Sequence, residues 1–117
     1  MIDNLGVDII ENERFATFID DDHKLSKILS DKEKNVLITF SNNNRKLEYI
    51  ASRFAAKEAL YKAGFRFEFN QVSILNYEDG RPYVSWDLNR KALISLSHNK
   101  TMSIAIVLAV EPCFEKQ

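Results

Sequence analysis

The 117-residue sequence has one cysteine, two prolines and three glycines, and it lacks both a long apolar run and an excess of charge of one sign. With Cys113 alone, no disulfide can form within the chain, and we expect a cytoplasmic protein. No stretch is apolar enough to suggest a membrane span, and the first residues do not resemble a signal peptide. The formal net charge of -1 provides no overall field for nucleic acid or a membrane surface. Any anion site must therefore be a local cluster of cations.

The pattern of apolar residues predicts a single domain over residues 1–117 with one modest core. Leu5, Val7 and Ile9 alternate with other residues, which predicts a first strand that buries this face. In the first half of the chain, the apolar residues then recur at helical spacing. Strands are expected at residues 71–77, 83–86, 91–96 and 103–110. Helices separated in this way from strands indicate an α+β fold, with an antiparallel sheet packed on a long helix.

The segment Arg45–Ala63 is the longest expected helix. It has no glycine or proline and is rich in the strongest helix formers. Asn42–Asn44 can cap its beginning, and Gly64 can end it in a left-handed turn. A capping box at Ser30–Glu33 predicts the beginning of a shorter helix before it.

The charges on this helix suggest a functional role. Arg53, Lys57 and Lys62 surround Glu58, which adjoins the apolar stripe. One carboxylate beside three cations suits a metal-bound phosphate, with the carboxylate on the metal and the cations on the phosphate oxygens. The alternative is a solvated flank that carries an ordinary ion pair between Glu58 and Lys62.

Asp8 has two interpretations at the end of the first strand. It can cap the helical segment that follows, or it can ligate a metal from a rigid strand-to-helix junction. Together with Glu58 it would offer two hard carboxylates, and without a His or Cys cluster this set favours Mg²⁺ over zinc. The sequence has no P-loop and no dinucleotide-binding glycine motif, so a phosphate site would depend on cations, metal and turn amides.

Three motifs carry a resemblance to a known family. They are G-V-D-I-I-E-N-E-R-F at Gly6–Phe15, R-F-A-A-K-E-A-L-Y-K-A at Arg53–Ala63 and S-L-S-H-N-K-T-M-S-I-A-I-V at Ser95–Val107. With G-R-P-Y at Gly80–Tyr83, the sequence resembles the 4′-phosphopantetheinyl transferases, and among them the short holo-(acyl carrier protein) synthase type. The resemblance implies transfer of the 4′-phosphopantetheine arm of coenzyme A to a serine of apo-acyl carrier protein, with release of adenosine 3′,5′-bisphosphate.

The resemblance also implies roles for individual residues. Asp8 and Glu58 would ligate Mg²⁺, with Mn²⁺ left open, and would be catalytic together with Lys62. The residues implied to contact coenzyme A are Arg45, Arg53, Lys57, Lys62, Gly64, Arg81, Pro82, Ser97 and His98. Arg14 would meet the acidic recognition helix of the carrier protein. Either Asp8 or a metal-bound water beside Glu58 would accept the serine proton.

The resemblance further implies a homotrimer with active sites at subunit interfaces. We expect the aromatic stretch Phe65–Phe69 to expose apolar surface unless a neighbouring subunit covers it. The sequence departs from the family pattern after Ala63, where the usual glycine-rich loop is missing, and Ser52 stands where glycine is common. Two other classes remain as alternatives: a carrier-binding module without catalysis, and a structural oligomer with fortuitous charges.

Overall fold

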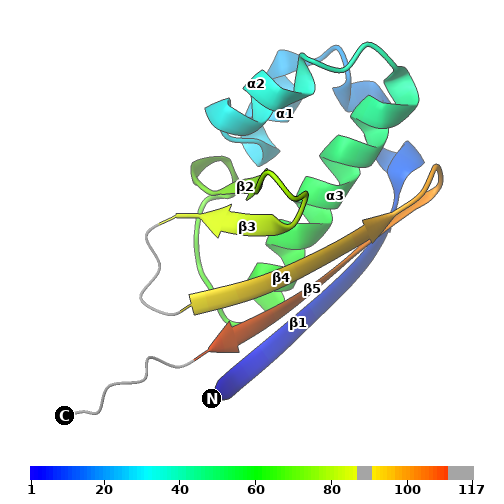
Figure 1. Cartoon of the computed structure of the whole chain (residues 1–117). Coiled ribbons are helices and arrows are strands. Elements are labelled where there is room, and N and C mark those ends of the chain that lie inside the picture. Colours follow the sequence, from blue (N-terminus) through cyan, green and yellow to red (C-terminus); the bar gives the residue numbers. More distant parts are fainter. Residues whose placement is uncertain (87–90, 111–117) are drawn as a thin grey trace.

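The computed structural model describes residues 1–86 and 91–110; residues 87–90 and 111–117, including Cys113, lie outside the described part. Two sheets form the β part of the fold (Figure 1). The larger sheet contains β1 (Ile2–Glu11), β5 (Met102–Val110) and β4 (Lys91–His98) in this order, and both pairings are antiparallel. The smaller sheet is an antiparallel ribbon of β2 (Ser73–Asn76) and β3 (Pro82–Ser85). The predicted α+β class is confirmed, but its strands form two sheets and not one.

Helix α3 (Asn43–Lys62) packs on one face of the larger sheet, against β1, β5 and β4. The side chain of Asn42 accepts a hydrogen bond from the backbone N–H of Arg45 at 3.1 Å and caps the helix. At the other end Gly64 adopts a φ of 107°, the left-handed conformation that favours glycine. The core between helix and sheet includes Ile50, Ala55, Ala59, Leu60, Ala105, Val107 and Ala109.

The short helical segments are η1 (Asn12–Phe18), α1 (Asp22–Ile28), α2 (Asp31–Leu37) and η2 (Phe69–Gln71). The predicted capping box is confirmed: Ser30 and Glu33 each accept a hydrogen bond from the other's backbone N–H. The segment after β1 is a 3₁₀ helix that begins at the buried Asn12. This side chain donates to Asn99 O and accepts from Ser103 Oγ, so the segment is tied to the β4–β5 turn. Among the described residues, no helix is both long enough and apolar enough to cross a membrane.

The prediction of which face of β1 is buried was wrong. Leu5, Val7 and Ile9 are 54%, 46% and 61% exposed, whereas Gly6 and Ile10 are buried. The cause is a close approach of β1 to α3: a Cβ built on Gly6 would lie 2.0 Å from the carbonyl oxygen of Ala59. Helix α3 therefore lies on the Gly6 side of the strand, and the alternating apolar residues face away from it.

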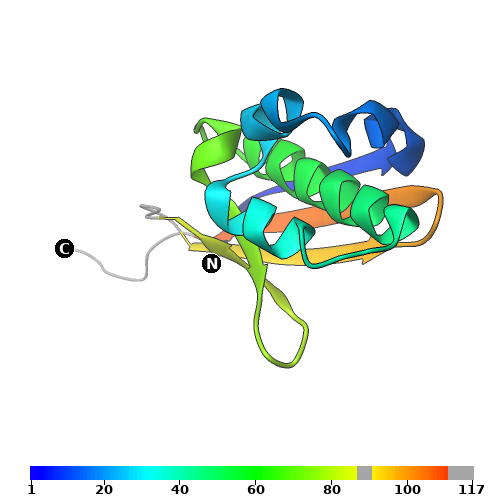
Figure 2. The same ribbon diagram turned by 90° about the horizontal axis from the view of Figure 1, so that it is seen from above.

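The outer face of the larger sheet is consequently apolar and bare. Its exposed apolar residues are Leu5, Val7, Ile9, Leu93, Ile104 and Ile106, which we call the outer apolar face. Figure 2 shows α3 on one side of this sheet, and no described helix on the other. The predicted exposure of Phe65–Phe69 was wrong, because Phe65 is buried and Phe67 is half-buried, with Phe67 packing on Phe69 and Trp86.

Candidate active site

Asp8 and Lys62 meet on the side of β1 that faces α3. The ammonium of Lys62 lies 3.1 Å from Asp8 Oδ1 and 3.1 Å from the carbonyl oxygen of Val7. Asp8 lies in mid-strand, opposite Ala105, and β1 continues to Glu11. The helix-cap interpretation of Asp8 is therefore excluded, because no helix begins beside it. The carboxylate is instead fixed by the strand, with a cation beside it.

Glu58 lies on α3 one turn before Lys62, and it is half-buried. Residues four apart on a helix are neighbours on its surface, so Glu58 borders the place where Lys62 meets Asp8. The described residues contain no ion pair between Glu58 and Lys62, since Lys62 pairs with Asp8. They also contain no cluster of three His, Cys, Asp or Glu side chains. Lys62 thus has one carboxylate, Asp8, in contact and a second, Glu58, one helical turn away, and two carboxylates would suit an ion that takes its remaining ligands from waters and phosphates.

A pocket with a volume of about 250 Å³ opens between α3, the end of β2 and the end of β4. It is lined by Phe40, Arg45, Glu48, Tyr49, Ser52, Arg53, Asn76 and His98. We call it the arginine pocket. Two of its cations lie over aromatic rings: Arg45 is 4.9 Å from the centroid of Phe40, and Arg53 is 4.2 Å from that of Tyr49. Three of the predicted site residues, Arg45, Arg53 and His98, therefore meet in one cavity suited to an anion.

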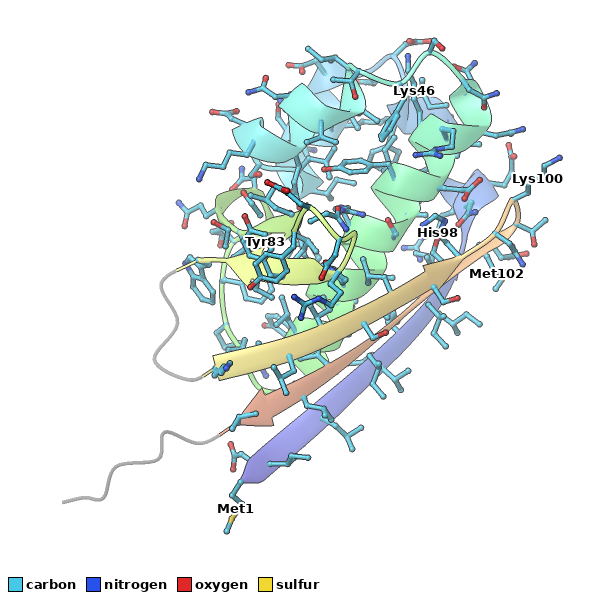
Figure 3. All side chains as sticks on the ribbon, viewed as in Figure 1. Met1, Lys46, Tyr83, His98, Lys100 and Met102 are labelled. Carbon is cyan, nitrogen blue, oxygen red and sulfur yellow. The ribbon has the colours of Figure 1, made fainter. Side chains whose placement is uncertain are left out.

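His98 reaches the arginine pocket from the end of β4 (Figure 3). Its Nδ1 lies 2.6 Å from Glu48 Oε1, so a carboxylate on α3 fixes the orientation of the imidazole. The neighbouring Ser97 pairs with Ile104 of the outer apolar face, whereas His98 pairs with the buried Ser103. The structure therefore does not bring Ser97 to the pocket, because adjacent residues of a strand point to opposite faces.

Arg53 is buried and serves the fold as well as the pocket. Its Nε donates to Ile74 O at 3.1 Å, and its terminal nitrogens donate to Ser52 Oγ and to Asn76 Oδ1. Burial lowers the pKa of this guanidinium and raises the pKa of Tyr49 beneath it to about 12. Because an arginine guanidinium is not deprotonated in proteins, Arg53 still presents a positive charge in the wall of the pocket.

Lys57, which the resemblance implies contacts coenzyme A, lies in the core of this structure and does not line the arginine pocket. Lys57 is fully buried, and its ammonium donates to Glu33 Oε1 at 2.6 Å and to the carbonyl oxygens of Ile28 and Phe69. An ammonium has three protons, and all three are used. Burial lowers the pKa of Lys57, while the negative charge of Glu33 opposes this shift. Lys57 joins α3 to α1 and η2, and does not face a ligand.

The other predicted residues lie apart from the arginine pocket of the same chain. Arg81 and Pro82 line a second cavity of about 420 Å³ between the β2–β3 ribbon and β4. The backbone N–H of Arg81 donates to Asp79 Oδ1, and its Nε donates to Asp79 Oδ2 at 2.8 Å. These two hydrogen bonds hold the pKa of Asp79 below its ordinary value.

Gly64 and Arg14 also lie away from the arginine pocket. The backbone N–H of Gly64 donates to Tyr61 O in the turn that ends α3. Arg14 is exposed on η1, with its guanidinium 5.4 Å from the ring centroid of Phe54.

Four residues of this region were missed by the sequence analysis: Glu33 as a buried partner, and Glu48, Tyr49 and Asn76 in the arginine pocket. Glu33 was identified only as half of a capping box, a role that does not predict an ion pair across the core. Glu48 lies on the same helix as Arg45, but its partner His98 is 50 positions away along the chain. No spacing in the sequence signals such a contact.

Comparison with known proteins places this chain in a family. A family model described as the 4′-phosphopantetheinyl transferase superfamily matches residues 4–109. The holo-(acyl-carrier-protein) synthase of Petrotoga mobilis is 34% identical, with 95% of this chain and 98% of the relative covered. That of Halalkalibacterium halodurans is 38% identical, with 92% and 95% covered. A crystal structure of the Bacillus anthracis holo-(acyl-carrier-protein) synthase, in complex with CoA (3′,5′-ADP), has a TM-score of 0.85 at 30% identity over 96% of this chain and 99% of that one.

The family model covers almost the whole described chain, and the similarity to these relatives runs nearly from end to end. The chain belongs to the 4′-phosphopantetheinyl transferase superfamily.

Proposed function

We propose that this chain is a holo-(acyl-carrier-protein) synthase, which transfers 4′-phosphopantetheine from coenzyme A to a serine of apo-acyl carrier protein. One observation carries the proposal: Asp8 and Lys62, 54 positions apart, meet at 3.1 Å one helical turn from Glu58. This juxtaposition occurs in a chain whose relatives are named for that reaction. The similar Bacillus anthracis enzyme was crystallised with CoA (3′,5′-ADP), which supports coenzyme A as the donor.

Asp8 and Glu58 would hold Mg²⁺, with Mn²⁺ as an alternative ion. Two carboxylates match the small number of protein ligands that Mg²⁺ accepts when a substrate supplies phosphate oxygens. The ion would supply charge neutralisation at the pyrophosphate of coenzyme A. The side chain of Lys62 is 53% exposed and its partner in this structure is Asp8. When Asp8 holds the ion, the ammonium of Lys62 would be free to contact the pyrophosphate oxygens.

The arginine pocket would hold the bisphosphate end of coenzyme A. Arg45, Arg53 and His98 provide two permanent positive charges and an imidazole in one cavity. The ring of Phe40, which already carries Arg45 at 4.9 Å, offers a flat apolar surface beside them. A nucleotide such as adenosine 3′,5′-bisphosphate would use both features. Its phosphates would face the positive charges, and its base would stack on the aromatic ring.

The reaction needs a proton acceptor close to the attacking serine. In the proposed step the serine oxygen forms a bond to the phosphorus that carries the pantetheine arm. The bond from this phosphorus to the bridging oxygen breaks, and adenosine 3′,5′-bisphosphate leaves. Asp8 would take the serine proton, or a water beside Glu58 would do so. Positioning and charge neutralisation supply most of the catalysis in phosphoryl transfer, so few residues are required.

The active enzyme would be a homotrimer with sites shared between subunits. The outer apolar face is an exposed patch of six large apolar side chains on a three-stranded sheet, and such patches are typical of protein interfaces. Arg81 and Pro82 lie on a hairpin away from the arginine pocket of their own chain, so they would serve the pocket of a neighbour. Arg14, exposed on η1, would contact the acidic carrier protein, and the enzyme would act in the cytoplasm.

The decisive experiment is mass spectrometry of apo-acyl carrier protein incubated with coenzyme A and the chain. We expect a gain of one phosphopantetheine arm that depends on Mg²⁺ and disappears with a chelator. Glu58→Gln should lose this activity while its circular dichroism stays unchanged, and Glu68→Gln, on an exposed loop residue, is the matched control. Binding of the carrier protein with no mass gain would favour a binding module. Absence of any thermal shift with coenzyme A would favour a structural oligomer.

A further inference from the structure

Strand β2 has an edge that is paired by side chains. The backbone N–H of Ile74 donates to Glu33 Oε2 at 2.7 Å, and its carbonyl oxygen accepts from Arg53 Nε at 3.1 Å. Both side chains are buried, and Glu33 is fixed in turn by Lys57 at 2.6 Å. The ribbon of β2 and β3 is thus attached to the helices through charged side chains, although it lies outside the larger sheet.

Asn76 extends this attachment to the turn that follows. Its Oδ1 accepts from Arg53 at 2.5 Å, and its Nδ2 donates to the carbonyl oxygen of Gly80 at 2.8 Å. Residues 77–81, which we call the arm, join β2 to β3 and project from the body of the molecule in Figure 2. The two ends of one amide therefore connect a buried guanidinium in the wall of the arginine pocket with the turn of the arm.

The geometry points to Asn76 as a positioning residue that sets the direction of the arm and couples it to Arg53. This inference rests on the proposed function, in which Arg81 on the arm and Pro82 at the start of β3 serve the coenzyme A site of a neighbouring subunit. The arm has a glycine at a φ of 95°, and its side chains contact near neighbours: Arg81 pairs with Asp79, and Tyr77 stacks on Tyr83 of β3. Its turn is closed by hydrogen bonds from Tyr77 N to Arg81 O and from Gly80 N to Tyr77 O. These close the turn but do not fix it relative to α3; the amide of Asn76 does so.

Two substitutions test the carbonyl oxygen and the NH₂ group of the Asn76 side chain. Asn76→Ala removes both hydrogen bonds. Asn76→Asp keeps an oxygen that accepts from Arg53, but it cannot donate to Gly80 O and places a negative charge beside that oxygen. Asn70→Ala is the matched control, since Asn70 also donates one side-chain hydrogen bond to a backbone carbonyl, that of Ser26 at 2.9 Å, away from the arm.

The first measurement is hydrogen–deuterium exchange of the peptide that contains residues 76–82, which requires no activity. We expect exchange at the Tyr77 and Gly80 amides to become about tenfold faster in both Asn76 variants and to stay unchanged in Asn70→Ala. Wild-type exchange rates in Asn76→Asp, or equal acceleration in Asn70→Ala, would overturn the inference. This result stands whether or not the chain transfers phosphopantetheine.

The second measurement is steady-state kinetics of the full-length chain. We expect KM for coenzyme A to rise about fivefold to tenfold in both Asn76 variants. A purely structural role would lower the amount of active enzyme and reduce kcat with KM unchanged, and that result would overturn the inference. If the wild type is inactive, the proposed function fails, whereas the exchange experiment still decides whether Asn76 fixes the arm.

Discussion

Lys57 and Glu33 form an ion pair of 2.6 Å with both side chains fully buried. The pair joins helix α3 to the first turn of α2, and the remaining hydrogen bonds of both groups involve four backbone groups, in α1, η2, β2 and the N-cap of α2. Every donor and acceptor that burial removes from water is thereby compensated. A cation that resembled a ligand-binding residue in the sequence is a structural element that stabilises the support of the site.

Removal of one partner of this pair should destabilise the fold strongly. Lys57→Met would leave Glu33 charged and buried, so we expect the free energy of unfolding to fall by about 3–5 kcal/mol. The double variant Glu33→Gln/Lys57→Met should lose less than the sum of the two single variants, because no charge is left unpaired. Urea unfolding followed by circular dichroism measures both. A loss below about 1 kcal/mol in Lys57→Met, with activity abolished, would support the predicted contact of Lys57 with coenzyme A.

Lys62 should behave in the opposite way. Its ion pair with Asp8 is half-exposed, so Lys62→Met should change the free energy of unfolding by less than about 1 kcal/mol. We expect turnover in the carrier-protein assay to fall by about 10² to 10³, the usual effect of removing one group that stabilises transition-state charge. Lys32→Met, at an exposed position on α2, is the control and should retain full turnover. Normal turnover in Lys62→Met would exclude Lys62 from catalysis.

Gly6 and Gly80 should differ in their response to alanine. At Gly6 a Cβ would lie 2.0 Å from the Ala59 carbonyl oxygen, so β1 and α3 must separate, and we expect Gly6→Ala to destabilise by about 3 kcal/mol or more. It should also lower turnover, because Asp8 lies two residues further on the same face. At Gly80 nothing lies within 4 Å, and Gly80→Ala should lose only about 1–2 kcal/mol from its φ of 95°. Equal losses in thermal unfolding would contradict the close approach at Gly6.

Tyr49→Phe should leave the fold as stable as the wild type or more stable. The hydroxyl is buried, and no described group is in hydrogen-bonding geometry with it. Removal of an unsatisfied buried hydroxyl is expected to raise the free energy of unfolding by about 1 kcal/mol at pH 7.

The same hydroxyl should make stability depend on pH. Burial raises the pKa of Tyr49 from 10.0 to about 12. The folded state therefore holds this proton more tightly, and the resulting stability is present below pH 10 and is lost as the pH rises through 12.

Unfolding curves at pH 9 and pH 11.5 test this difference. The wild type should lose more stability between these two values than Tyr49→Phe. A parallel loss in both proteins would show that the Tyr49 hydroxyl titrates normally.

A charge on the outer apolar face should abolish self-association. Ile9 is 61% exposed on β1, and Ile9→Glu adds a carboxylate without touching the core between β1 and α3. In sedimentation velocity we expect the wild type to sediment as a trimer and the variant as a monomer that keeps its circular dichroism. Glu11→Gln, at an exposed position of the same strand, is the control and should remain trimeric. A wild type that is monomeric at working concentrations would contradict shared active sites.

Local signals predicted much of the fold. The capping box at Ser30–Glu33 and the glycine after α3 specify helix ends through contacts within a few residues, and the structure has both. The periodicity of α3 likewise reflects the face that this helix buries against the larger sheet. Such features are local, so the sequence carries them directly.

The failures concern contacts between distant segments. The alternation at Leu5, Val7 and Ile9 correctly indicated an apolar face but not what covers it, because a bare sheet face and a buried one have the same pattern. Lys57 could not be recognised as buried, since its three acceptors come from separate parts of the chain. The family resemblance implied that Asp8, Glu58 and Lys62 share one site, whereas the contacts of Asp8 with Lys62 and of Glu48 with His98 required the coordinates.

The separation of the β2–β3 ribbon from the larger sheet has a consequence for sequence change in this lineage. Since the register of β4 and β5 does not depend on the ribbon, residues can be inserted into or deleted from the turn after Asn76 without shifting any strand of the larger sheet. A change in the length of this hairpin would thus leave Asp8 and His98 in their places.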